Sequence, residues 1–259
     1  MNLSSISIPV KAARHFYAAA LLAFGIQHFI FGFFIAGRPM PWPFGLPGEL
    51  IIAYASGILF IVAAVAIVIH KKAVEALMGV AIIILLWAGL RNIIHVVTTL
   101  DTGGNLTNMG KALTLGSGAL LVARSFEPAT TYRMLSLAVL CQYFTGSFLL
   151  ASGIQHFLYA DFVRYLVPEW IPGALFVTYF SGVALCAAGL GLLTGIKARL
   201  ACILAGWMVL IWFFVLHLPR AIENNNQNEW TAVFEALAVS GILFLLVNTI
   251  RERKVHLSR

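Results

Sequence analysis

Long uncharged apolar runs separate the few charged residues of this chain, and they restrict its fold more than any other feature. Three of them, at 50–69, 134–160 and 170–196, are long enough to cross a lipid bilayer, because a spanning helix needs about 20 residues. They are apolar on every face, whereas strands of a spanning β-barrel alternate apolar and polar residues in short segments. The runs predict an all-α integral membrane protein embedded in a lipid bilayer.

The composition supports this prediction. Apolar residues make up 61% of the chain and charged residues 10%, which does not fit a water-soluble globule. The net charge of +7 would suggest nucleic-acid binding in a soluble protein, but here the basic residues form short clusters between apolar runs. We therefore interpret them as markers of topology and expect no nucleic-acid partner.

Breaks between the apolar runs divide the chain into eight candidate transmembrane helices. They cover approximately 14–36, 50–70, 73–99, 105–124, 134–160, 173–195, 199–218 and 230–250. The fourth is the least apolar of the eight, since only its stretch 112–123 is free of charge. An even number of crossings brings both termini to one side of the membrane.

Basic residues are distributed unequally between the two predicted faces. The face of the termini holds Lys11, Arg14, Lys71, Lys72, Arg124, Arg133, Lys197, Arg199, Arg251, Arg253, Lys254 and Arg259. The other face holds Arg38, Arg91, Lys111, Arg164 and Arg220. Since cytoplasmic loops carry the excess of Lys and Arg, we predict a bacterial inner-membrane protein with both termini cytoplasmic.

An internal duplication divides the chain into two similar halves. The pentapeptide Gly-Ile-Gln-His-Phe at 25–29 recurs letter for letter at 153–157. Further matches follow, with the offset falling from 128 to 125: Pro47-Gly48 with Pro172-Gly173, Tyr54 with Tyr179, Ser56-Gly57 with Ser181-Gly182, and Trp87 with Trp212. We predict two four-helix transmembrane repeats, 1–128 and 129–259, arranged as two parallel-repeat bundles around a pseudo-two-fold axis along the membrane normal.

The repeated motifs resemble a known family. Four predicted crossings, a Gly-x-x-His element late in the first helix, a Pro-Gly entry to the second with a following Ser-Gly, and a short basic turn before the third are similar to the DoxX-like family. The unit occurs twice, over approximately 15–125 and 143–250. The resemblance implies a membrane four-helix bundle, associated in some members with quinone-linked oxidation of sulfur compounds or with membrane redox complexes. Some relatives are thought to act through thiols, but Cys141, Cys186 and Cys202 form no CxxC here.

Polar side chains inside the apolar helices are the candidate functional residues. A charge at the centre of a spanning helix costs about 2.5–3.5 kcal/mol on insertion scales, so it needs a partner or a watery cavity. The first half carries Gln27, His28, Arg91, Asn92, His95 and Lys111, and the second carries Gln155, His156, His217, Arg220 and Glu235. The four histidines of this set all lie toward the non-cytoplasmic side, which predicts one polar chamber that opens outward.

These residues predict a site that binds a quinone-like headgroup or a small oxidisable substrate. We expect His28 and His156 to exchange protons, Arg91 to hold the anionic or carbonyl end of the ligand, and Glu235 to balance the charge. Gln27, Asn92, His95, Lys111, Gln155, His217 and Arg220 are expected to bind the ligand. We assign no metal ligands. Haem or copper on His28, His95, His156 and His217 is a less favoured alternative, because no HxxxH or ExxH spacing occurs.

Other interpretations remain open at this point. The Gln-His pairs can simply hydrogen-bond between helices, Arg91 and Arg220 can extend to the outer headgroups, and Glu235 can form a structural ion pair with Lys111 or an arginine. The favoured function is a membrane redox protein or subunit, with redox partner subunits or further copies of the chain as its partners. An anion transporter and an assembly partner without chemistry are the alternatives, and whether the chain is an enzyme stays open.

Overall fold

The computed structural model describes residues 8–37, 47–126 and 132–257, and all regular structure in these ranges is helical. The predicted boundary at 128/129 and the basic residues Arg38 and Arg259 lie outside them. The elements of the first half are α1 (Val10–Phe31), α2 (Glu49–Ile69), α3 (Ala73–Trp87), η2 (Ala88–Ile93), α4 (Ile94–Thr99) and α5 (Gly104–Arg124). Those of the second half are α6 (Tyr132–Leu158), α7 (Ala160–Arg164), α8 (Ala174–Thr194), α9 (Ala198–Trp212), η3 (Phe213–His217), α10 (Leu218–Asn224) and α11 (Gln227–Leu257).

The third long helix of each half contains a π-helical turn at the same place. In the first half α3, η2 and α4 form one continuous helix, and in the second half α9, η3 and α10 do the same. Both π-helical segments begin directly after the matched tryptophans, Trp87 and Trp212. A π-turn changes the direction in which the following side chains point, and such turns are frequent at functional sites.

Six helices in the described part of the chain are long and apolar enough to cross a membrane. They are α2, the continuous α3–α4, α6, α8, the continuous α9–α10, and α11. Helices α1 and α5 have comparable lengths of 22 and 21 residues. Neither is as apolar as these six over a membrane-spanning length. The all-α prediction is therefore confirmed for the described residues, and six of the eight predicted spans are long and apolar enough to cross a membrane.

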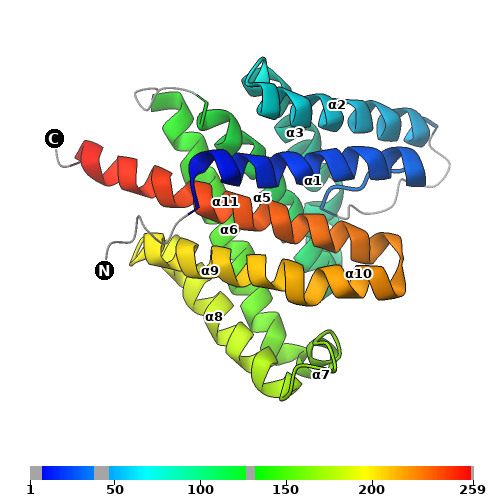
Figure 1. Cartoon of the computed structure of the whole chain (residues 1–259), viewed down its shortest axis with the longest axis vertical. Coiled ribbons are helices and arrows are strands. Elements are labelled where there is room, and N and C mark those ends of the chain that lie inside the picture. The colour runs from blue at the N-terminus through cyan, green and yellow to red at the C-terminus, as the bar shows by residue number, and fades with distance from the viewer. Residues whose placement is uncertain (1–7, 38–46, 127–131, 258–259) are drawn as a thin grey trace.

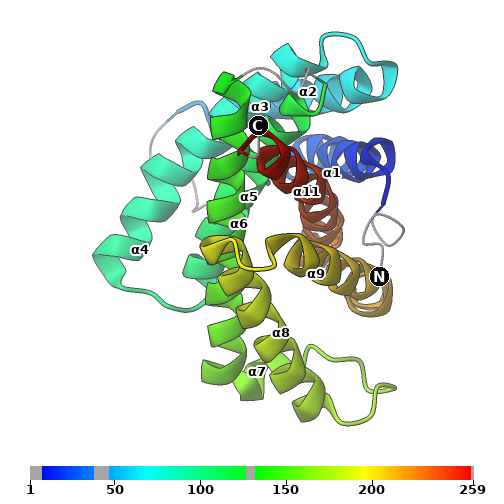
Figure 2. The same cartoon turned by 90° about the vertical axis from the view of Figure 1, so that its left-hand side faces the viewer.

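The last long helix of each half lies at the centre of the structure. Helix α11 packs against α1 and α9, and α5 packs against α3 and α6, while α5 and α11 also touch each other. Each central helix thus contacts the first helix of the opposite half, and Figure 1 shows α1 beside α11. Figure 2 shows the same central position of α11 from the side. The two halves are consequently interlocked rather than merely adjacent.

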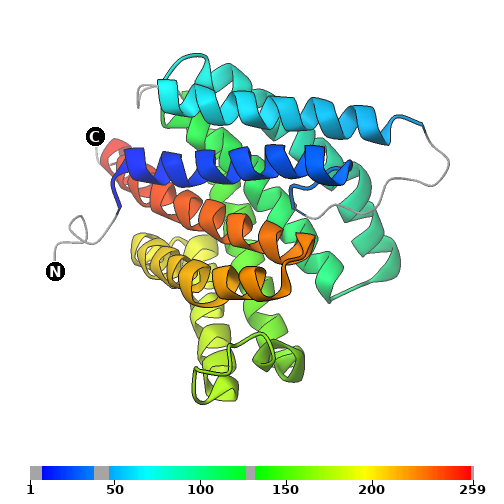
Figure 3. The same cartoon turned by 45° about the vertical axis from the view of Figure 1, so that its right-hand side comes forward.

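Apolar side chains fill the interior and also cover the outside. Helix α11 is buried along almost all of 231–250, whereas the outer helix α2 leaves Ile51, Ile58 and Val62 more than half exposed. A soluble monomer rarely exposes so much contiguous apolar surface, so this surface fits contact with lipid. Helix α1 begins and α11 ends at the same end of the bundle, as Figure 3 shows.

The repeated pentapeptide makes the same contacts in both halves. A Cβ at Gly25 would lie 2.9 Å from the carbonyl oxygen of Gly57, and a Cβ at Gly153 would lie 2.8 Å from that of Gly182. These glycines let α1 approach α2, and α6 approach α8, at backbone distance. The aromatic residue that ends the motif stacks on the matched tyrosine in each half, with ring centroids 5.2 Å and 5.8 Å apart. The internal duplication therefore extends to local geometry.

Candidate functional site

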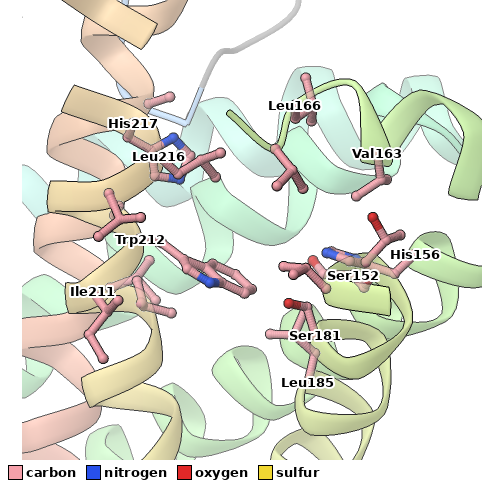
Figure 4. A pocket seen from close by; sticks show the side chains of 18 of the residues that line it. Ser152, His156, Val163, Leu166, Ser181, Leu185, Ile211, Trp212, Leu216 and His217 are labelled. Atoms are coloured by element: carbon pink, nitrogen blue, oxygen red, sulfur yellow. Dashed lines mark hydrogen bonds between the residues drawn. The ribbon is translucent and has the colours of Figure 1, made fainter. Parts of the chain in front are cut away.

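A cavity of about 440 Å³ lies inside the second half. Its walls come from α6, α8, the α9–η3 helix, α11 and α5, and the segment from Val163 to Ile171 covers one side. Figure 4 shows Trp212 reaching from its helix toward Ser152 and Ser181, with Leu166 and His217 nearby. Most of the wall is apolar, with a few polar groups, which is the usual composition of a small-molecule site.

Four of the eleven predicted site residues line this cavity: Lys111, His156, His217 and Glu235. The Lys111 Nζ atom lies 2.7 Å from Glu235 Oε2, and the Glu235 side chain is only 4% exposed. The two residues occupy matching positions of α5 and α11, so the pair joins the central helices of the two halves. The ion pair that the sequence left as one alternative is present, and it forms part of the cavity wall.

His156 extends from α6 into the cavity and has a defined orientation. Its Nδ1 lies 2.7 Å from the carbonyl oxygen of Ser152, one helical turn earlier. A carbonyl oxygen only accepts hydrogen bonds, so Nδ1 carries the hydrogen. The ring is nearly parallel to that of Trp212, with an interplanar angle of 16° and centroids 6.3 Å apart. His217 reaches the same cavity from the end of the π-helical segment.

The first half fills the corresponding space with its own side chains. His28 is fully buried, its Nδ1 lies 2.6 Å from the carbonyl oxygen of Phe24, and its Nε2 accepts a hydrogen bond of 3.2 Å from the Ile35 backbone N–H. The rings of Phe34 and Phe60 meet the imidazole edge-on, each with its centroid 5.2 Å away. His28 is therefore a satisfied interior residue, and its predicted role in proton exchange stays a prediction.

The two matched glutamines of the repeat join the halves to each other. Gln27 accepts a hydrogen bond of 2.8 Å from the Thr231 hydroxyl. Gln155 accepts one of 2.7 Å from the Thr107 hydroxyl, and its amide also donates to two carbonyl oxygens at the start of α5, 2.7 Å and 2.9 Å away. Each glutamine thus links the first helix of its own half to the central helix of the other.

The remaining predicted residues lie away from the cavity. Arg220 makes two contacts with the carboxylate of Glu229, at 2.6 Å and 3.3 Å, and so ties α10 to α11. His95 lies 3.3 Å from the side-chain nitrogen of Asn105. Arg91 and Asn92 belong to the π-helical segment of the first half, where Arg91 is half-buried and Asn92 is buried.

The four histidines proposed as alternative haem or copper ligands do not converge on one point. His156 and His217 line the cavity, whereas His28 is enclosed in the first half and His95 lies near the start of α5. Within the described ranges, no three or more His, Cys, Asp or Glu side chains come together in a way that could hold a metal ion. His156 and His217 thus face the cavity, and the described residues form no metal-binding cluster around them.

Most of the cavity wall is not among the predicted residues, because that prediction rests on polar groups in apolar helices and most of the wall is apolar. Trp212, Ser152, Thr178, Ser181 and Leu185 all face the cavity. Comparison of the two repeats contains a usable signal, since large residues of the first half are replaced by smaller ones. Phe24 corresponds to Ser152 and Phe60 corresponds to Leu185.

Comparison with known proteins gives one match. A family model described as a domain of unknown function (DUF8561) matches residues 145–248. No curated protein and no solved structure matches the chain significantly. The matched range contains most of α6, all of α8 and α9, and much of α11, and so includes the larger part of the cavity wall.

Proposed function

We propose that the chain crosses the membrane eight times, with both termini cytoplasmic, and that its second half binds a lipid-soluble ring compound of the quinone class. Helices α1 and α5 complete the eight crossings, since they are as long as the six apolar helices and lie within the same bundle. Two of their polar side chains, Gln27 and Lys111, contact protein neighbours rather than lipid.

The observation that carries the proposal is the cavity beside His156 and Trp212. A volume of about 440 Å³ accommodates a substituted quinone ring with a short tail. The apolar wall suits the ring and tail, while the imidazole rings of His156 and His217 place polar groups in the same wall. The resemblance to the DoxX-like family points the same way, toward quinone-linked redox chemistry in the membrane, carried out with partner subunits.

The two alternative functions fit these contacts less well. An anion carrier needs a free cation in its pathway, but Arg220 is paired with Glu229, and Lys111 is paired with Glu235. An assembly partner without chemistry does not need a cavity lined by His156 and Trp212. We therefore favour ligand binding and use a binding experiment to separate the possibilities.

The test is calorimetric titration of the purified chain in detergent with a short-chain benzoquinone and a short-chain naphthoquinone. Leu185→Phe introduces at the cavity wall the residue that the first half carries at the matching position, Phe60, and should weaken binding at least about ten-fold. Leu190→Phe is the matched control, because Leu190 lies on the same helix and is half exposed on the outer surface. Absence of binding by both quinones and by their reduced forms, or equal affinity in the two variants, would overturn the proposal.

A further inference from the structure

The first half shows how this kind of site holds an aromatic ring, because the chain itself occupies it. The Phe34 ring lies against both His28 and Trp87, with its centroid 5.2 Å from the imidazole and 5.6 Å from the indole. The next residue, Ile35, donates its backbone N–H to His28 Nε2. The occupant is therefore an aromatic ring accompanied by a hydrogen-bond donor that meets the imidazole.

The residue after the first helix differs between the halves, and this difference explains why the chain does not fill the corresponding space in the second half. Helix α1 ends at Gly32, whose φ of 72° lets the chain turn back and bury Phe34. Ala160 occupies the matching position at the offset of 128, and a residue with a Cβ adopts a positive φ only at a cost. There the chain enters α7 instead, and Phe162, the counterpart of Phe34, is 66% exposed.

His156 keeps the hydrogen-bonding arrangement of His28. In both rings Nδ1 donates to the carbonyl oxygen four residues earlier, at 2.6 Å for His28 and 2.7 Å for His156. In the neutral ring this leaves Nε2 as an acceptor. In the first half Ile35 supplies the donor, whereas no hydrogen bond reaches His156 Nε2 from any residue that the structure describes. Figure 4 shows the His156 ring directed into the cavity, where a ligand can supply that donor.

We infer that the cavity selects an aromatic ring bearing a hydroxyl donor, held against Trp212 with its O–H directed at His156 Nε2, as the first half holds Phe34 and Ile35. This inference rests on the proposed function and sharpens it. The oxidised form of a quinone has only acceptor oxygens, whereas the reduced form carries hydroxyl groups. The cavity is thus a site for the hydroquinone form, and the first half has no second site because its own chain fills the space.

The unaltered chain tests the inference with three ligands that share one ring. These are a short-chain hydroquinone kept reduced under anaerobic conditions, its dimethyl ether, and the corresponding benzoquinone, each titrated into the full-length protein in detergent. The hydroquinone should bind about ten-fold or more tightly than either of the others, because a ligand without a donor leaves the buried Nε2 unpaired. No substitution is needed for this comparison, so a folding defect cannot obscure it.

Two variants then assign the preference to His156. His156→Phe keeps an aromatic ring but removes the acceptor, and should bind all three ligands with similar affinity. His156→Gln retains an oxygen acceptor near the position of Nε2 and should preserve a preference for the hydroquinone.

Three results would overturn the inference: equal or tighter binding of the quinone, equal or tighter binding of the ether, or a preference that persists in His156→Phe. Each of them leaves ring binding in the cavity intact. Failure of all three ligands to bind would instead remove the proposed function itself.

Discussion

The ion pair between Lys111 and Glu235 gives a demanding test of the packing at the centre of the structure. The pair joins α5 to α11 at 2.7 Å, with side-chain exposures of 18% and 4%. Removing one partner of such a buried pair leaves an uncompensated charge, which typically costs about 3–5 kcal/mol. We therefore expect Lys111→Met and Glu235→Met each to destabilise the protein strongly, while the double replacement recovers most of the loss.

The pair lies at equivalent positions of the two halves, so we also expect its two residues to be exchangeable. Since the two residues occupy matching places on matching helices, exchanging them as Lys111→Glu with Glu235→Lys should restore the pair with little loss of stability. Lys111→Glu alone brings two carboxylates together and should be the least stable variant of the series.

Thermal unfolding in detergent, at one fixed heating rate, measures these differences. For a chain of this size a loss of 3–5 kcal/mol corresponds to a fall in Tm of about 6–20 °C. The double Met variant and the exchanged pair should lie within about 4 °C of the parent, on the same scale. Single variants with falls below about 2 °C, or a double variant whose fall equals the sum of the singles, would refute the reasoning.

Three further expectations concern helix contacts and topology. Gly153→Leu should separate α6 from α8, because a Cβ there would lie 2.6 Å from Cys186 Sγ. This variant should lower the yield of monodisperse protein in size-exclusion chromatography. Gly89→Ala is the control and should leave the yield unchanged, because a Cβ at Gly89 meets nothing within 4 Å. Gln155→Leu should lower the Tm more than Gln27→Leu, because Gln155 makes three inter-half hydrogen bonds against one, each worth about 0.6 kcal/mol; equal losses would contradict this. Cysteines introduced as Ile196→Cys and Glu169→Cys in a Cys186→Ala background should react with an impermeant maleimide from opposite membrane faces, and labelling from one face would exclude the proposed topology.

The helices and the duplication could be predicted from the sequence because each depends on a local pattern. Apolar runs of about 20 residues predict spanning helices, and the repeated pentapeptide predicts two similar halves, which agrees with the matched contacts of Gly25 and Gly153. The π-helical turns after the matched tryptophans gave no such signal, since a π-turn depends on the packing around it. The short helix α7 lies almost wholly between the predicted helices 134–160 and 173–195, where the sequence predicts no helix.

The packing partners of the helices could not be predicted in the same way. A helix that is apolar on every face does not reveal which side meets lipid and which meets protein, so the contact of α1 with α11 was not foreseen. For the same reason the polar residues were expected to share one chamber. The structure gathers Lys111, His156, His217 and Glu235 at the cavity and distributes the others among contacts between helices.

The divergence at Lys111 and Glu235 also determines how this molecule can be assembled. Two copies of the first half, packed as the halves are here, would bring lysine against lysine, and two copies of the second would bring glutamate against glutamate. Only a mixed assembly neutralises the centre. Joining both halves in one polypeptide guarantees a one-to-one ratio of first half to second half. The chain is thus equivalent to an obligate heterodimer whose two subunits are always made together.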